Sequence, residues 1–265
     1  MRERQWRTRL TDHVQISLIL PAYNERASIG ATLKDIAGYF QSRCMTYEII
    51  VAADGDDGTR ELVTEMRRTN PYLVVIGNVE RGGKGRGIRE AVAIARGQII
   101  GYADADNKVD IREFEKIQPF LTEGYDLVFG SRALSQSVVE QVQPWFRRIG
   151  SKAFGVFMHA VVGLPGIHDT QCGFKFFTGD AAHRIFEAQI IDGYMFDVEI
   201  LSLAREMGLK MKEVPIRWHD DGDSRLNLVA GNLRNARDIF RIRASRNRVN
   251  NLPEVAKARA QSLGD

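Results

Sequence analysis

Short apolar segments alternate with amphipathic segments along the first half of the chain, and this alternation most limits its fold. The apolar segments have the length of buried strands and span residues 16–20, 48–52, 73–77, 98–103 and 126–130. Apolar residues recur at helical spacing in the segments 27–40, 59–68, 88–95 and 111–121. Strands and helices that alternate in this way form βαβ units, so we predict a Rossmann-like α/β fold with a mostly parallel sheet flanked by helices.

The pattern changes after Arg132. Residues 145–164 are apolar nearly all round, residues 169–178 form a compact polar motif, and residues 213–218 resemble a short strand. Further on, apolar residues recur at three–four spacing at Leu226, Val229, Leu233, Ala236 and Phe240, beside an arginine stripe at Arg234, Arg237, Arg241 and Arg248. We therefore expect amphipathic helices toward the C-terminus.

Composition excludes several classes of protein. The two cysteines of the 265 residues are far apart, which argues against a disulfide scaffold or a zinc site. Residues 1–13 are basic and have no signal-peptide core, and no run of about 18 apolar residues occurs, so we expect a cytoplasmic protein. The formal net charge is only +3, and the basic stripe lacks interleaved aromatic residues, so we expect no nucleic-acid partner.

The triplet Asp104-Ala105-Asp106 follows the apolar segment 98–103. A strand that ends there presents two carboxylates at the carboxyl edge of the sheet, where open α/β sheets bind ligands. Mg²⁺ and Mn²⁺ accept one or two carboxylates and take their other ligands from water and phosphates, so the triplet suggests a metal–diphosphate site. A plain turn or helix cap remains the alternative.

Other strand ends also carry polar motifs. After the first strand, Tyr23 could stack on a base and Glu25 could accept a hydrogen bond from a base or ribose. Asp54, after the second strand, is placed to receive donors from a nucleobase, although the loop could be only a turn. The glycine-rich segment 81–87 stands before a helix, where free amides and Lys84 could bind an anion. It has neither Walker A nor dinucleotide-fingerprint spacing.

Taken together, segments 21–25, 54–59, 84–87 and 104–106 resemble the sugar-nucleotide half of the family 2 glycosyltransferases, which have the GT-A fold. Segments 130–132, 169–175, 196–199, 214–218 and 224–226 are similar to the dolichyl-phosphate β-glucosyltransferase branch and its relative, dolichyl-phosphate mannose synthase. The resemblance implies one GT-A domain over residues 14–248. Residues 14–132 form its nucleotide-sugar half and 133–248 its acceptor half, between a basic extension (1–13) and a flexible tail (249–265).

The resemblance also assigns roles to individual residues. The nucleotide-sugar would be held by Pro21, Tyr23, Glu25, Asp54, Lys84, Asp104 and Ala105. A Mg²⁺ or Mn²⁺ ion would be held by Asp104 and Asp106. The diphosphate or acceptor phosphate would lie near Arg132, Gln171 and Lys175, and the catalytic residues would be Asp106, Arg132 and Asp197, the last at the place of a catalytic base in many members.

Three departures from the family pattern bear on the branch. Ala53 replaces the first of two paired aspartates, which leaves open the carboxylate that meets the base. Lys108 and Asp197 stand where mannose synthases often have glutamine, which favours the glucosyltransferase branch and, with it, uridine over guanosine. That branch usually has an N-terminal membrane anchor, and residues 1–13 show none.

We therefore expect an inverting, metal-dependent glycosyltransferase that moves a hexose, with glucose favoured, from a nucleoside-diphosphate sugar to a polyprenyl or dolichyl phosphate. The segment 145–164 and the arginine-striped helix could lie peripherally on the cytoplasmic face of a membrane and meet the lipid there. A soluble or glycan hydroxyl acceptor is the alternative, and it requires a base, for which Asp197 is the candidate. A non-catalytic sugar-nucleotide binding protein is the third reading.

Overall fold

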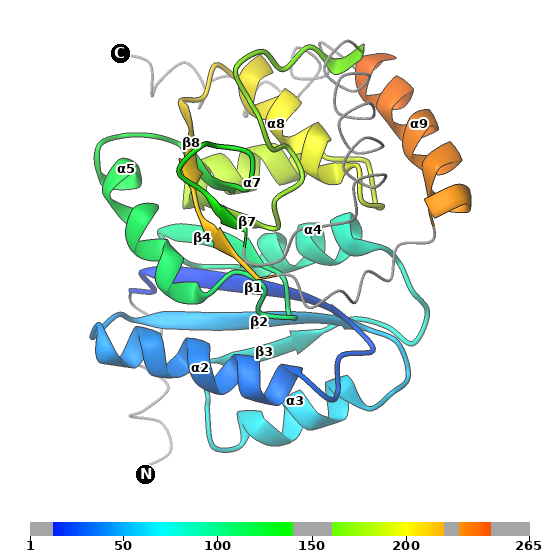
Figure 1. The fold of residues 1–265 in the computed structure, drawn as a ribbon. Coiled ribbons are helices and arrows are strands. Elements are labelled where there is room, and N and C mark those ends of the chain that lie inside the picture. Colours follow the sequence, from blue (N-terminus) through cyan, green and yellow to red (C-terminus); the bar gives the residue numbers. More distant parts are fainter. Residues whose placement is uncertain (1–12, 140–160, 220–227, 245–265) are drawn as a thin grey trace.

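The computed structural model describes residues 13–139, 161–219 and 228–244, with side chains of the last range from residue 234 onward. A seven-stranded sheet in the order β3-β2-β1-β4-β7-β5-β8 forms its centre (Figure 1). Its strands are β1 (Ile16–Tyr23), β2 (Tyr47–Asp54), β3 (Leu73–Ile76), β4 (Ile99–Ala103), β5 (Leu127–Ser131), β7 (Phe174–Thr178) and β8 (Met211–Pro215). A second small sheet pairs β6 (Val138–Val139) with β9 (Arg217–Trp218).

Helices cover both faces of the sheet, and each face has its own apolar core. One face is covered by α2 (Ile29–Ser42), α3 (Thr59–Arg67), the 3₁₀ helix η1 (Ile111–Lys116) and α5 (Gln118–Thr122). The other is covered by α4 (Lys84–Ile94), α7 (Gly179–Ala188), α8 (Phe196–Glu206) and α9 (Leu228–Ala244). The predicted α/β fold, a mostly parallel sheet flanked by helices, is confirmed.

The strand β7 lies in the middle of the sheet and runs antiparallel to both neighbours, β4 and β5. The sequence did not reveal it, because it reads only as the end of the polar motif 169–178. Four of its five residues are buried, so it shows no alternation of apolar and polar positions. Its register places Lys175 opposite Tyr102 of β4 and Phe129 of β5.

The helix α9 confirms the predicted C-terminal amphipathic helix, but not its apolar face. Phe240, predicted on that face, is 55% exposed, whereas Ile239 and Ile242 are buried. The three–four spacing fits more than one face of this helix, and the face with Ile239 and Ile242 is the one that joins the core beside α8. The predicted arginines Arg234, Arg237 and Arg241 are exposed, and Leu226, Arg248 and residues 145–160 lie outside the described residues.

One edge of the sheet gathers the polar motifs. The parallel strands β1, β2, β4 and β5 all end there, and β7 begins there.

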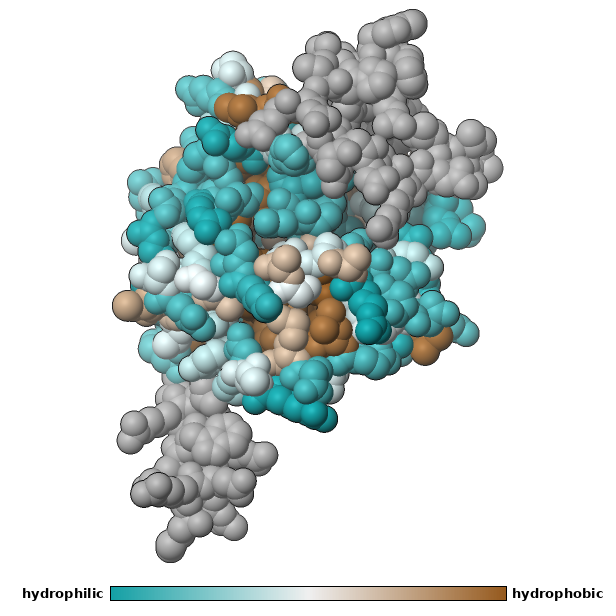
Figure 2. Space-filling view, turned by 60° about the horizontal axis from the view of Figure 1, so that its bottom comes forward, coloured by the Kyte–Doolittle hydropathy of each residue, from teal (hydrophilic) through white to brown (hydrophobic). Residues whose placement is uncertain are grey.

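On the side of the molecule where α2 and α3 lie, the surface is mostly hydrophilic, with a small apolar area near the centre of the view (Figure 2). Within the described residues, no helix has the length and apolar character needed to cross a membrane.

Candidate active site

The Asp104–Asp106 loop is fixed from behind by α2. Thr32 Oγ1 donates a hydrogen bond of 3.0 Å to the carbonyl oxygen of Ala105, whose side chain is buried. The aspartates on either side keep partly exposed carboxylates. Lys84 Nζ lies 2.6 Å from Asp104 Oδ1, and Lys108 Nζ lies 3.3 Å from Asp106 Oδ2. The loop therefore presents two carboxylates, each balanced by one lysine.

The charges of this loop act on one another. Burial and the neighbouring charge of Asp104 raise the pKa of Asp106, and Lys108 opposes the shift. Burial alone would lower the pKa of Lys84, but the charges of Asp104 and Asp197 outweigh it and raise that pKa above its ordinary value. The close carboxylates thus create a site that favours additional positive charge.

A divalent cation fits this donor set. Hard cations of the Mg²⁺ type bind through one or two carboxylates and complete their coordination with phosphate and water oxygens. Asp104 and Asp106 supply such a pair, and their mutual repulsion would be relieved by the ion. In the described part of the chain, no group of three or more His, Cys, Asp and Glu side chains is arranged as an all-protein metal site.

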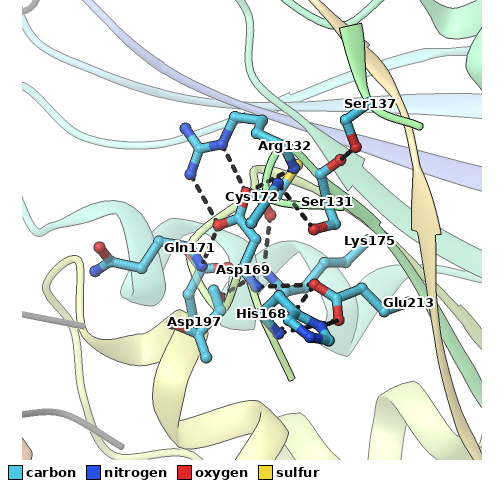
Figure 3. Close-up of polar contacts among 12 residues, drawn as sticks. Ser131, Arg132, Ser137, His168, Asp169, Gln171, Cys172, Lys175, Asp197 and Glu213 are labelled. Carbon is cyan, nitrogen blue, oxygen red and sulfur yellow. Dashed lines mark hydrogen bonds and ion pairs between the residues drawn. The ribbon is translucent and has the colours of Figure 1, made fainter. Parts of the chain in front are cut away.

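Arg132 follows β5 and is held by Asp169 through a two-pronged ion pair. Its Nε and Nη2 donate to the Asp169 oxygens at 2.7 and 2.9 Å, and its backbone amide adds a third bond of 3.0 Å (Figure 3). Burial raises the pKa of Asp169, but the hydrogen bonds and charge of Arg132 outweigh it and lower that pKa. The guanidinium also lies 5.5 Å from the ring centre of Trp218. Arg132 is therefore a fixed positive charge at the same sheet edge as Asp104.

The loop 169–173 leads from the Arg132–Asp169 ion pair to the carboxylates of Asp104 and Asp106. A Cβ atom at Gly173 would lie 2.1 Å from Asp104 Oδ2, so only glycine lets this backbone approach the carboxylate. Gln171 is exposed on the same loop, and its Nε2 lies 3.8 Å from the sulfur of Met195. Its predicted place near a phosphate stays a prediction.

Lys175 does not face the site opening, so its predicted phosphate contact is wrong. Its side chain is completely buried, and Nζ donates to Thr170 O, Cys172 O and Asp197 Oδ1 at 3.1, 2.6 and 2.7 Å. The sequence placed Lys175 among exposed motif residues because the strand β7 was not recognised. Helices cover both faces of the sheet, so a lysine on an inner strand such as β7 points into the protein interior.

Asp197 lies in the first turn of α8 and is only 3% exposed. Its Oδ1 accepts hydrogen bonds from Tyr102 Oη at 2.5 Å and from Lys175 Nζ at 2.7 Å. Burial raises the pKa of Tyr102, and the negative charge and hydrogen bond of Asp197 raise it further. The carboxylate therefore bonds to core groups, and its role as a base stays a prediction.

Tyr23, which is predicted to contact the nucleoside, is 38% exposed at the end of β1. Arg81 Cζ lies 4.2 Å from the centre of the Tyr23 ring, and Arg81 Nη2 donates to Tyr194 Oη at 3.0 Å. Sequence reasoning gave no role to Arg81 or Tyr194, although the arginine that opens the glycine-rich segment was a signal. Pro21 is half-buried within β1, and Glu25 Oε2 accepts from Ser28 Oγ at 2.8 Å.

Asp54 has partners other than the predicted nucleobase. Its two oxygens accept the backbone amides of Asn78 and Gly82 at 3.1 and 2.7 Å. These bonds tie the end of β2 to the loop that carries Arg81. Asp54 therefore holds the loop next to Tyr23, and direct contact with a base stays a prediction.

The glycine-rich segment does not offer a free helix N-terminus. The helix α4 begins at Lys84, and the amides of Gly85 and Arg86 donate to the carbonyl oxygen of Asp192 at 2.8 and 3.2 Å. A Cβ atom at Gly83 would lie 2.3 Å from that oxygen, which explains the glycine. Two of the amides predicted to bind an anion are thus occupied within the chain, and the role of Lys84 in anion binding stays a prediction.

Comparisons with known proteins agree with this geometry. The profile described as "Glycosyl transferase family 2" matches residues 17–186. A dolichyl-phosphate beta-glucosyltransferase of Dictyostelium discoideum is 32% identical over 88% of this chain and 75% of its own length. The human protein of the same name is 30% identical over 86% of this chain and 75% of its own length.

Solved structures support the fold. A mannosyl-3-phosphoglycerate synthase from Rubrobacter xylanophilus superposes with a TM-score of 0.63 at 17% identity, covering 94% of this chain and 77% of its own. A glucosyl-3-phosphoglycerate synthase from Mycobacterium tuberculosis was solved with Mn²⁺, uridine diphosphate and phosphoglyceric acid. It superposes with a TM-score of 0.63 at 20% identity, covering 88% of this chain and 78% of its own. The fold is GT-A, and the chain belongs to glycosyl transferase family 2 as a glycosyltransferase similar to the dolichyl-phosphate β-glucosyltransferases.

Proposed function

We propose that this protein transfers glucose from UDP-glucose to a polyprenyl phosphate by a single inverting displacement, with a divalent metal at Asp104 and Asp106. The observation that carries the proposal is the pair of carboxylates at one sheet edge, flanked by Lys84 and the Arg132 guanidinium. This arrangement suits a substrate that carries a metal-bound diphosphate.

The donor's leaving group is a nucleoside diphosphate, which gains negative charge as the glycosidic bond breaks. A bound Mg²⁺ or Mn²⁺ supplies electrostatic stabilisation of that charge. Arg132, held rigid by Asp169, is a preorganised donor of charge-assisted hydrogen bonds to a phosphate. Lys84, fixed on Asp104, adds a second positive charge beside the diphosphate.

The surroundings of Asp197, the candidate base, support a phosphate acceptor over a hydroxyl acceptor. A phosphate is largely ionised at neutral pH, since its second pKa is about 6, so it attacks the anomeric carbon without a strong base. A hydroxyl acceptor needs a base in the transition state. The burial of Asp197 and its bonds to Tyr102 and Lys175 support the base-free route. The chain's task is then to hold donor and acceptor in line.

The identity of donor and acceptor rests on similarity. The curated relatives bear the name dolichyl-phosphate beta-glucosyltransferase, which supports glucose and a polyprenyl phosphate. A neighbour of the same fold was solved with Mn²⁺ and UDP-glucose, which supports a uridine donor and a divalent metal. A GDP-sugar is the competing donor, because the preference for uridine rests on similarity alone.

The lipid acceptor places the reaction at a membrane surface. The arginines Arg234 and Arg237 of α9 point outward, while Ile239 and Ile242 pack inward. A basic helix face of this kind binds anionic lipid headgroups, at about 1 kcal/mol for each arginine near the surface. We therefore place the protein peripherally on the membrane that contains its acceptor.

The test offers the purified protein Mn²⁺, a panel of UDP- and GDP-sugars, and either a short polyprenyl phosphate or the matching polyprenol. Mass spectrometry should detect a hexosyl-phosphoprenol from UDP-glucose and no product from the polyprenol, because the alcohol lacks the ionised oxygen. A product from polyprenol, or from a soluble sugar alone, would contradict the phosphate acceptor. Release of nucleotide from GDP-sugars only would contradict the uridine donor.

A further inference from the structure

We infer that Lys175 and Asp197 form a buried positioning pair that shapes the loop 169–173 and thereby sets the places of Arg132 and Asp104. This inference rests on the proposed function only for its kinetic readout. Neither residue meets solvent: the side chain of Lys175 is completely buried and that of Asp197 is 4% exposed. Both therefore act on substrates through other residues.

The ammonium of Lys175 has its three protons matched by three acceptors. Two are carbonyl oxygens of the loop, those of Thr170 and Cys172, and the third is the carboxylate of Asp197 (Figure 3). Both carbonyl oxygens lie within 3.1 Å of the same nitrogen. They are therefore closer together than the roughly 6.6 Å that separates the carbonyls of residues two apart in an extended strand. Lys175 thus holds the loop in a shape that its backbone alone does not favour.

The shaped loop touches both halves of the site. At its start, Asp169 holds Arg132 through three hydrogen bonds. At its end, Gly173 lies so close to Asp104 that a methyl group would collide with Oδ2. A shift of this loop therefore moves the phosphate-binding guanidinium and one metal-binding carboxylate together.

Asp197 orients the side chain of Lys175 and is its ion-pair partner. An unpaired ammonium in a core is strongly disfavoured, and the carboxylate at 2.7 Å compensates it. Tyr102 Oη donates to the same oxygen. Tyr102 lies on β4, two residues before Asp104. The pair therefore links α8, β7 and β4 next to the end of β4, which the carboxylates of Asp104 and Asp106 follow.

The variants are Lys175→Met, Asp197→Asn and the double variant, with Glu48→Gln as the matched control. Glu48 is also a buried carboxylate in a charged cluster, bonded to Ser17 and Arg96, but it lies at the opposite edge of the sheet. The single variants leave one buried charge unpaired. The double variant removes both charges, which restores much of the lost stability and keeps the test possible if Lys175→Met does not fold.

The first readout is the reactivity of Cys172 toward a disulfide reagent in a Cys44→Ser background, and it requires no substrate. Burial raises the pKa of Cys172 to about 12, so the native thiol reacts slowly. We expect fast labelling of Cys172 in Lys175→Met and in the double variant, and slow labelling in Glu48→Gln. Slow labelling in the double variant would show that the loop keeps its shape and would overturn the inference.

The second readout is kcat with donor and lipid phosphate. Both single variants and the double variant should lose about 10- to 100-fold in kcat, as outer-shell changes do, with the pH profile unchanged. Recovery of kcat in the double variant would show a purely structural pair. A loss confined to Asp197→Asn, with the acidic limb of the profile gone, would identify a base instead. A wild type without lipid product refutes the proposed function alone, because the Cys172 readout still decides the inference.

Discussion

At the residue scale, the site depends on charges held in pairs. Lys84 with Asp104, Arg132 with Asp169 and Lys175 with Asp197 each join two different elements of the fold. A pair of this kind fixes a side chain before substrate arrives, so less ordering is needed in the transition state. The three pairs differ in exposure, and only the first two reach the site opening.

The Arg132–Asp169 pair makes stability depend on pH. Arg132 lowers the pKa of Asp169 in the folded chain, so the pair stabilises the fold above the ordinary aspartate pKa of about 3.9. That contribution is lost as pH falls through the lower, folded pKa. We expect Asp169→Asn to cost about 2 kcal/mol of unfolding free energy at pH 7, the scale of a charged hydrogen bond.

Urea unfolding of both proteins between pH 2 and pH 7 measures this difference. It should be largest above pH 4 and shrink toward pH 2. A difference that grows on acidification would contradict the sign of the pKa shift.

At the element scale, the sequence predicted the parallel part of the fold and missed the inserted strand. Strands β1 to β5 show as short apolar runs between amphipathic helices, and their polar ends mark the site edge. The strand β7 has no such signature, because it is buried on both faces and follows the polar loop directly. Because β7 was not predicted, the sequence did not show that the side chain of Lys175 is buried.

The sequence also did not reveal which side chains and backbone groups pair over long distances along the chain. Motif position predicted that Asp104 and Arg132 would share the site edge, but not that Asp169 holds Arg132. The capping of α4 by the carbonyl of Asp192 is a contact across about a hundred residues, and no local pattern encodes it. Such long-range partners decide which groups remain available to a ligand.

The approach of the loop 169–173 to β4 is tested by Gly173→Ala. The added methyl would meet Asp104 Oδ2, so the carboxylate must move, and we expect a loss of kcat of about 10- to 100-fold, the effect of disturbing a metal ligand's support. Gly38→Ala in α2 is the control, since its Cβ meets nothing within 4 Å and should stabilise the helix by about 0.5–1 kcal/mol. Equal kinetics of the two variants would contradict the close approach.

At the scale of the whole molecule, the proposed reaction joins a water-soluble donor to a lipid acceptor. The single GT-A domain over residues 14–248 is our proposal for the unit that does both. The exposed arginines of α9 are our proposal for its membrane-facing charge.

Flotation with liposomes tests that surface. The protein should float with anionic vesicles and not with neutral ones, and the pair Arg234→Gln and Arg237→Gln should weaken binding by about 2 kcal/mol, roughly 30-fold. Raising the salt concentration should weaken it further, because the attraction is screened. Equal flotation with neutral vesicles would contradict an electrostatic contact through α9.

The central claim is that the carboxylates at the end of β4 support sugar transfer to a polyprenyl phosphate. The most direct measurement is the yield of hexosyl-phosphoprenol, by mass spectrometry, from UDP-glucose and Mn²⁺ with wild type, Asp106→Ala and Asp110→Ala. Asp110 is the matched control, because its carboxylate caps η1 and pairs with Arg112 instead of joining Asp104 and Asp106. The account predicts product from wild type and Asp110→Ala, and none from Asp106→Ala or after chelation of the metal. Undiminished product from Asp106→Ala would contradict it.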